Sequence, residues 1–276
     1  MKTILVLTDF SKKAENAALF ALRIAEKTHA NIILYNSLEI FEPVDAVESS
    51  SWVYEHSEVI RAESLIALRS LQANLAGRHA PGTLEPEISL LNEIGYDLGA
   101  NANQLVREKN IDLVVMGIRG DNTTSHIFNG SDASDILDHV SCPVLFVPES
   151  GSFDNFKTIV FANDLKKDYE KPISFLVGIA RTGNSQIILT HLGEYENKAY
   201  KCLNLIKNTL AYSNVTSRLF PLENMGEQLR KFALSVKAGL VVFIHHKDDK
   251  FENFFYGSES KGMLNHNDTP LLILQG

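Results

Sequence analysis

The most informative stretch of the sequence is Ile111-Asp112-Leu113-Val114-Val115-Met116-Gly117-Ile118-Arg119-Gly120, followed after nine more residues by Gly130-Ser131. Its apolar part, Ile111–Met116, predicts a buried β-strand, and Asp132–His139 predicts a helix. In a strand–loop–helix unit, main-chain N–H groups and the positive end of the helix dipole converge on an anion. A glycine lets the main chain approach a phosphate closely, and Ser131 can cap the helix or donate its hydroxyl. The stretch therefore predicts a nucleotide site.

The two halves of the chain repeat one organisation. Lys2–Asp9 is matched by Lys157–Asp164, an offset of 155 positions (164 − 9), and Gly130-Ser131 is matched by Gly257-Ser258, an offset of 127 (257 − 130). The second copy therefore lacks 28 residues (155 − 127) in its middle, and Phe41–Glu55 of the first copy is a suitable extra segment. Self-similarity on this scale indicates duplicated domains rather than a solenoid of short repeats.

Short apolar runs alternate with helical patterns in both copies. The runs are almost continuously apolar, as expected of parallel strands covered by helices on both faces. The strands expected in the first copy are Ile4–Leu7, Asn31–Asn36, Glu87–Leu91, Ile111–Met116 and Val144–Val147, and the helices are Ala14–Thr28, Val53–Ala76, Leu98–Lys109 and Ser131–His139. Those of the second copy are strands Thr158–Ala162, Gln186–His191, Thr216–Phe220, Leu240–Ile244 and Leu271–Leu274, and helices Ile173–Arg181, Ala199–Ala211, Glu227–Lys237 and Ser258–Asn265.

This alternation predicts an α/β protein with two doubly wound, five-stranded parallel-sheet domains in tandem. The expected domains are residues 1–148 and 153–276, and Glu149–Ser152 is the expected linker between them. A chain of 276 residues is long for one compact core and suits two domains of ordinary size.

Composition excludes several classes of function. The net charge of −8 and the lack of a Lys/Arg cluster argue against nucleic-acid binding, which needs a basic surface. No apolar run approaches the roughly 20 residues that cross a bilayer. The chain opens directly into a β-like run without the pattern of a signal peptide, which favours the cytoplasm. The two cysteines, Cys142 and Cys202, do not form a disulfide framework.

Three features together resemble the universal stress protein family. They are an Asp closing the first strand (Asp9), the G-x2-G-x9-G-S pattern at Gly117–Ser131, and a last strand that opens Cys142-Pro143-Val144-Leu145-Phe146-Val147. The resemblance covers essentially the whole chain as a tandem pair. It implies strand order 3-2-1-4-5, a nucleotide-binding cleft, and pairing of domains through their last strands, either in a homodimer or within the chain. Strands 1 and 4 then lie side by side at a topological switch point, where ligands bind beyond the carboxyl ends.

The resemblance also implies a site for an adenine nucleotide, ATP with or without Mg²⁺. In ATP-binding relatives the residue matching Asp9 contacts the nucleoside, main chain near Asn36 or Ser37 contacts adenine, and the glycines with the serine hold the phosphates. The residues expected at the site are Asp9, Asn36, Ser37, Met116, Gly117, Arg119, Gly120, Gly130, Ser131 and Asp132.

The chain also departs from the family pattern. Asp132 and Asp135 lie in the first turns of the helix, where they repel a triphosphate unless a divalent ion intervenes, and Arg119 is the nearby cation in the sequence. In the second copy Ile244 and Lys247 replace the first two glycines. We therefore expect at most one nucleotide per chain, held by the first domain.

The sequence lacks the motifs of the common catalytic sites. It has no G-x-x-x-x-G-K-[ST] loop, no G-x-G-x-x-G after the first strand, no G-x-S-x-G elbow and no H-E-x-x-H. We expect a ligand-dependent regulator of the stress response, with at most slow ATP hydrolysis. The alternative is a scaffold of the same fold that binds a partner or dimerises without a nucleotide. His245-His246 with Asp248-Asp249 suggests a metal, but neighbouring side chains on an extended segment point apart, so a solvated loop is expected there.

Overall fold

A computed structural model describes residues 1–38, 50–95, 97–118, 131–163, 170–192, 204, 207–208, 211–220, 225–245 and 269–276. The strands are β1 (Thr3–Leu7), β2 (Asn31–Leu38), β3 (Ile88–Ile94), β4 (Leu113–Ile118), β5 (Val144–Pro148), β6 (Thr158–Asn163), β7 (Gln186–Leu192), β8 (Val215–Phe220), β9 (Leu240–His245) and β10 (Leu271–Gln275). The helices are α1 (Lys12–Thr28), α2 (Ser50–Gly77), α3 (Leu98–Glu108), α4 (Ser131–His139), α5 (Glu170–Gly183) and α7 (Met225–Ser235).

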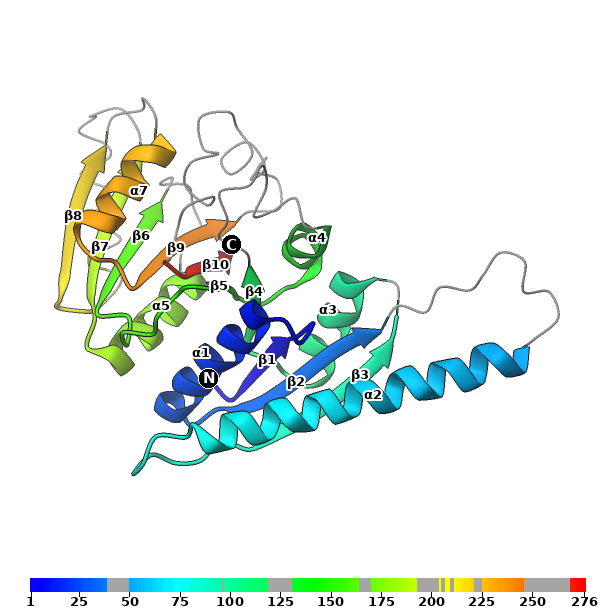
Figure 1. Ribbon diagram of the computed structural model, residues 1–276. Coiled ribbons are helices and arrows are strands. Elements are labelled where there is room, and N and C mark those ends of the chain that lie inside the picture. The colour runs from blue at the N-terminus through cyan, green and yellow to red at the C-terminus, as the bar shows by residue number, and fades with distance from the viewer. Residues whose placement is uncertain are drawn as a thin grey trace.

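The ten strands form one sheet in the order β3-β2-β1-β4-β5-β10-β9-β6-β7-β8 (Figure 1). Pairing is parallel within each half, and β5 and β10 pair antiparallel at the centre, with Leu145 opposite Leu272. The predicted fold class and the strand order 3-2-1-4-5 are confirmed. Pairing through the last strands occurs within the chain, so the carboxyl ends of the two sets of strands point in opposite directions.

The strand registers match the repeat seen in the sequence. Ile4 pairs with Ile32 in the first half and Ile159 with Ile187 in the second, an offset of 155 for both strands (159 − 4). The next pairing joins Ile32 to Ile88 and Ile187 to Val215, so the offset has dropped to 127 (215 − 88). The 28 residues that the second half lacks therefore lie between its second and third strands. In the first half this interval contains α2.

Two layers of helices cover the sheet and define two apolar cores. On one face α1, α2 and α5 pack on the strands, and on the other face α3, α4 and α7 do so (Figure 1). Each core runs through both halves: Val6 and Phe161 share one cluster, and Leu5 and Val160 share the other. Burial on both faces explains why the strands are apolar at nearly every position.

The observed element boundaries differ from the predicted ones at two informative places. The Asp112 carboxylate accepts the main-chain N–H groups of Lys2 and Thr3, so Asp112 belongs to a turn, and β4 begins at Leu113 and runs on through Gly117. Helix α2 begins at Ser50, so part of the predicted extra segment is helical. Most of the helix expected over 199–211 and all of that over 258–265 lie outside the described residues.

The predicted linker lies against the first helix. Asn16 on α1 donates its side-chain amide to the carbonyls of Pro148 and Gly151, at 2.8 and 3.0 Å. The Phe153 ring packs edge-on against Phe20 of the same helix, with ring centroids 5.4 Å apart. These contacts fix the direction in which the chain enters the second half. Within the described ranges no helix has the length and apolar character needed to cross a lipid bilayer.

Candidate functional site

The chain leaves β1 through a tight turn at the switch point between β1 and β4. Thr8 closes the ladder by donating its N–H to the carbonyl of Tyr35 at 2.9 Å, and its hydroxyl oxygen accepts the N–H of Phe10 at 3.0 Å. Phe10 has φ of 61° and a side chain 39% exposed. A bulky aromatic in the left-handed region is an unusual conformation, and such strain concentrates at functional sites. The turn presents the residue before Phe10 to solvent.

That residue, Asp9, is held as an exposed carboxylate. Its Oδ1 accepts the N–H of Ser11 at 3.0 Å and the Ser11 hydroxyl, and its Oδ2 lies 3.3 Å from Nζ of Lys13. Partial burial acts to raise the pKa of the Asp9 carboxyl, but the hydrogen bonds from Ser11 and the charge of Lys13 outweigh it and hold the pKa below its ordinary value. The side chain is 56% exposed, so an ionised acceptor faces solvent at the end of β1.

Gly117 brings α1 directly onto the end of β4. A Cβ at Gly117 would overlap the main-chain carbonyl of Lys13 and the N–H of Ala14. Lys13 therefore contacts both sequence motifs, because its backbone lies on Gly117 and its ammonium pairs with Asp9. Lys13 was not predicted as a cation near this edge. Its position one helical turn after Asp9 was the available signal.

Asn36 and Ser37 lie where β2 extends past the end of β1. The Asn36 amide is buried, donating to the carbonyl of Thr8 at 2.7 Å and accepting the hydroxyl of Ser64 from α2 at 2.8 Å. The carbonyl of Tyr35 accepts a hydrogen bond on the β1 side of the strand, and the carbonyl of Leu38 accepts one on the β3 side. Because successive residues of a strand direct their main-chain groups to opposite sides, the N–H and C=O of Ser37 face the β1 side. Of the two predicted residues, Ser37 is the one whose main chain faces the space beyond Asp9.

The other predicted residues fall into two groups. Met116 is half-buried in β4, paired with Leu7 and Phe146, and Ser131 and Asp132 open α4, with Asp132 exposed. Arg119, Gly120 and Gly130 lie outside the described residues. The structure thus brings Asp9, Lys13 and Gly117 together, with Ser37 on the neighbouring strand.

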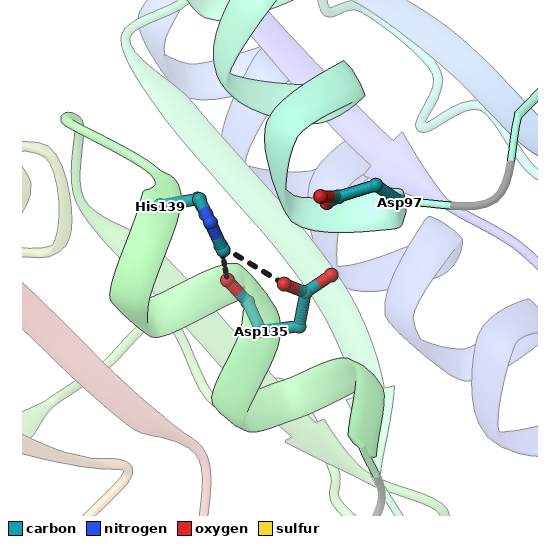
Figure 2. A group of neighbouring side chains, drawn as sticks. All are labelled: Asp97, Asp135 and His139. Carbon is teal, nitrogen blue, oxygen red and sulfur yellow. Dashed lines mark hydrogen bonds and ion pairs between the residues drawn. The ribbon is translucent and has the colours of Figure 1, made fainter.

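Asp135 contacts His139 on its own helix, α4, and lies beside Asp97 at the start of α3 (Figure 2). Its Oδ2 accepts the N–H of Gly99 in the first turn of α3 at 2.6 Å, and Nδ1 of His139 lies 2.9 Å from its Oδ1 and 2.9 Å from its main-chain oxygen. The hydrogen bond to the Asp135 carbonyl and the nearby carboxylates of Asp135, Asp97 and Asp138 raise the pKa of His139, against a smaller effect of burial. The predicted repulsion between Asp135 and a phosphate is therefore reduced, because this charge is paired.

Asp97, Asp135 and His139 place three ligand atoms within 4.8 Å of one another, which is close enough for a metal ion. All three groups already have structural partners, because Asp97 caps α3 by accepting the N–H of Ala100 at 2.7 Å. The cluster also lies at the positive end of the α3 dipole, which disfavours a cation. Its geometry fits a clasp between α3 and α4 better than a metal site.

The second half differs at the equivalent edge. Ile244 stands in β9 where β4 carries Gly117. His245, expected in a solvated loop, is instead buried within β9 and paired in register with Gln275, so that expectation was wrong. His246, Lys247, Asp248, Asp249 and Asp164 lie outside the described residues.

A separate cleft of about 760 Å³ lies at the opposite end of the first-half strands, between Met1, Asp112 and Ser141 on one side and α5 on the other. Its acidic group, Asp112, already accepts two main-chain N–H groups. The cleft offers no convergent set of charges, so its size does not make it a better candidate than the β1–β4 edge.

Comparison with known proteins agrees with the topology. A profile of the Universal stress protein family matches residues 1–148. A protein of Staphylococcus haemolyticus named as a universal stress protein is 24% identical over 176 residues, which cover 61% of this chain and 97% of that one. The crystal structure of a universal stress protein from Archaeoglobus fulgidus superposes with a TM-score of 0.71 at 14% identity, covering 99% of this chain and 98% of that chain. A structure from Pseudomonas aeruginosa, also named as a universal stress protein, gives 0.57 at 13% identity, covering 100% and 93%.

The fold and the site edge define a tandem doubly wound α/β protein with strand order 3-2-1-4-5 in its first half. The family profile covers more than half of the sequence. The chain belongs to the universal stress protein family.

Proposed function

We propose that the first half binds an adenine nucleotide, ATP, at the carboxyl ends of β1 and β4, and that this ligand regulates the protein's contacts with a partner. The observation that carries the proposal is that an ionised, exposed Asp9 pairs with the ammonium of Lys13, while the main chain of Lys13 packs on Gly117 at the end of β4. Open α/β sheets bind ligands at this kind of switch point.

Each group has a role that its chemistry suits. The Asp9 carboxylate accepts hydrogen bonds from ribose hydroxyls, and the outward main chain of Ser37 offers one donor and one acceptor to the edge of adenine. The phosphates extend toward Gly130 and the start of α4, where Ser131 and the helix dipole favour an anion. Asp132 is exposed in that first turn, so we propose that Mg²⁺ accompanies the phosphates there.

The direct test measures nucleotide in the purified full chain. Mass spectrometry of the released ligand identifies it, and calorimetry with ATP and Mg²⁺ gives its affinity. Asp9→Asn keeps the size of the side chain but removes the charge, and we expect it to weaken ATP binding by about tenfold to a hundredfold. Asp164→Asn, the equivalent change in the second half, is the matched control and should leave binding unchanged.

The opposite results have clear meanings. Equal losses from the two Asp variants would place the ligand elsewhere or in both halves. If the native protein carries no nucleotide and shows no thermal shift with Mg-ATP, the proposal fails.

A second candidate is a scaffold without a nucleotide. It is favoured by Gly117, because the contact with the α1 backbone alone requires a glycine there. This function predicts normal partner or self-association in Asp9→Asn and no ligand in the purified protein.

We also infer that the protein is not a dedicated enzyme and that residues 1–148 and 153–276 are its domains. At most it hydrolyses ATP slowly. Phosphate release should then disappear in Gly130→Val and Ser131→Ala, whereas release unchanged by both substitutions would identify a contaminating ATPase.

A further inference from the structure

Helix α2 carries an unpartnered face that is directed away from the sheet. Leu68, Leu71, Leu75 and Ser64 are buried against the strands, whereas Val59 and Ile66 are 55% and 67% exposed. A helix of 28 residues is about 42 Å long, and the strands β2 and β3 beneath it are 8 and 7 residues, or about 26 Å at most. The amino-terminal part of α2 extends beyond the sheet (Figure 1).

Five exposed residues on this face form a stripe at successive spacings of three, four, four and three. They are Val59, Ala62, Ile66, Ser70 and Ala73, and all five are exposed. This spacing places them on one side of a helix over about 21 Å. Two large apolar side chains flanked by small ones let a second helix approach closely.

The stripe is symmetric about Ile66. Val59 and Ala73 lie seven positions on either side of it, and Ala62 and Ser70 lie four. Three positions on either side stand Glu63 and Arg69, both exposed and of opposite charge. If two copies of α2 cross antiparallel on a two-fold axis at Ile66, Glu63 of each copy faces Arg69 of the other. Such a self-complementary patch is what an isologous dimer requires.

The central strands of the sheet are not available for pairing between two chains. β5 and β10 pair with each other inside the chain, so the edge strands of the sheet are β3 and β8. We propose that the exposed face of α2 is a homodimer interface, in which two copies pack antiparallel about Ile66 with reciprocal Glu63–Arg69 ion pairs. We expect a contact limited to one helix face of each copy to be weaker than standard interfaces of about 1,600 Å², so the dimer should form reversibly in the micromolar range.

The test is sedimentation equilibrium of the full chain between about 1 and 200 μM, a range that spans such an affinity. The native protein should show a monomer–dimer equilibrium. Ile66→Glu places a charge on the two-fold axis and should leave monomer at every concentration, with an unchanged circular dichroism spectrum because Ile66 is exposed. Leu234→Glu, at an exposed residue of α7, is the matched control and should dimerise normally.

Charge exchange tests the antiparallel register. Glu63→Arg or Arg69→Glu alone places like charges opposite each other twice and should weaken the dimer by about tenfold. The double variant restores opposite charges and should recover native affinity. In addition, Ile66→Cys should link to itself with a short bismaleimide, whereas Ala73→Cys should link only to Val59→Cys.

A native chain that stays monomeric at the highest concentration overturns the proposal. So does an Ile66→Glu variant that still dimerises, or a double charge variant that remains as weak as the single ones. Self-linking of Ala73→Cys would replace the antiparallel packing by a parallel one and would likewise refute it.

Discussion

Glu26 near the end of α1 and Arg181 near the end of α5 occupy equivalent positions in the two halves, 155 residues apart (181 − 26), and carry opposite charges. The Glu26 carboxylate accepts the N–H of Ala80 at 2.7 Å, and the Arg181 guanidinium donates to the carbonyl of Ala211 at 3.3 Å. Each side chain thereby ties its helix to the turn that precedes the third strand of its half. The same contact is made once with an acceptor and once with a donor.

The edge of the sheet beyond β1 and β4 shows a different kind of divergence. Gly117 admits the backbone of α1, whereas the second half has Ile244, whose side chain fills space. At Glu26 and Arg181 the two halves make an equivalent contact with side chains of opposite charge. At the site edge the second half has lost the glycine on which the first depends. The two halves therefore share an architecture but differ in their packing at this edge.

The largest loss of stability should come from replacing Gly117 by isoleucine, the residue that the second half has at the equivalent position. Gly117→Ile forces α1 off the sheet, because its Cβ would overlap main-chain atoms of Lys13, and we expect a loss of about 3 kcal/mol in the free energy of unfolding. Urea denaturation measures it. The control is Gly178→Ala on α5, where a Cβ meets nothing within 4 Å, so stability should rise by roughly 0.5–1 kcal/mol. A Gly117→Ile loss below about 1 kcal/mol would show that α1 can shift freely.

Substitutions of Glu26 and Arg181 should lower the stability by less, and by unequal amounts. Glu26 is 5% exposed, accepts from Arg23 and lies 3.0 Å from Nδ1 of His79. Glu26→Ala leaves these part-buried groups without their acceptor and should cost about 2–3 kcal/mol. Arg181 is exposed, and Arg181→Ala should cost under about 0.5 kcal/mol. Thermal unfolding of both variants checks the difference. Equal losses would contradict the burial argument.

Acid should weaken the Glu26 contact in a defined direction. Burial acts to raise the pKa of Glu26, but the hydrogen bonds from Ala80, Arg23 and His79 and the charge of Arg23 outweigh it and lower the pKa below its ordinary value. The stabilisation is therefore present above the pKa of Glu26 in the unfolded chain and is lost as the pH falls through its lowered pKa. The difference in stability between the native chain and Glu26→Gln should shrink in the same window.

The smallest effect should come from the clasp between α3 and α4. Because the folded-state pKa of His139 is raised, the stabilisation is full below its ordinary value of 6.5 and is lost as the pH rises through the raised pKa. With His139 45% exposed, His139→Gln should cost about 0.5 kcal/mol or less at pH 6 and nothing well above neutrality. The second half has Gly262 in place of Asp135. Asp135→Asn removes the carboxylate charge but keeps the main-chain carbonyl that His139 contacts, so it should lower the pKa of His139 only in part, as measured by NMR. A pKa of His139 unchanged in Asp135→Asn would exclude the Asp135 carboxylate as a cause and leave the hydrogen bond to the Asp135 carbonyl.

The strands and their order could be predicted because burial on both faces leaves an unmistakable apolar pattern. Ile4–Leu7, Gln186–His191 and Leu240–Ile244 were placed within one or two residues of their observed ends. The start of β4 was misjudged because Ile111 extends the apolar pattern by one residue beyond Asp112, whereas the Asp112 carboxylate binds the main chain of Lys2 and Thr3. A hydrogen bond between residues 110 positions apart leaves no local signal.

Two residues predicted at the candidate site share a neighbour in the structure, whereas the contacts around them were not predicted. Asp9 and Gly117 were marked by motif and spacing, and the structure places both against Lys13. The pairing of Asp135 with Gly99 and His139 was not foreseen, because it depends on how closely two helices pack. The roles of Arg119, Gly120 and Gly130 stay predictions.

The antiparallel join between β5 and β10 has a consequence for assembly. Two separate chains that paired through their last strands would come apart on dilution, by mass action. Here both strands belong to one polypeptide, so the ten-stranded sheet persists even at a few molecules per cell. Synthesis of one chain also delivers the two unequal halves in a fixed ratio, with no chance of pairing two of the same kind across that join.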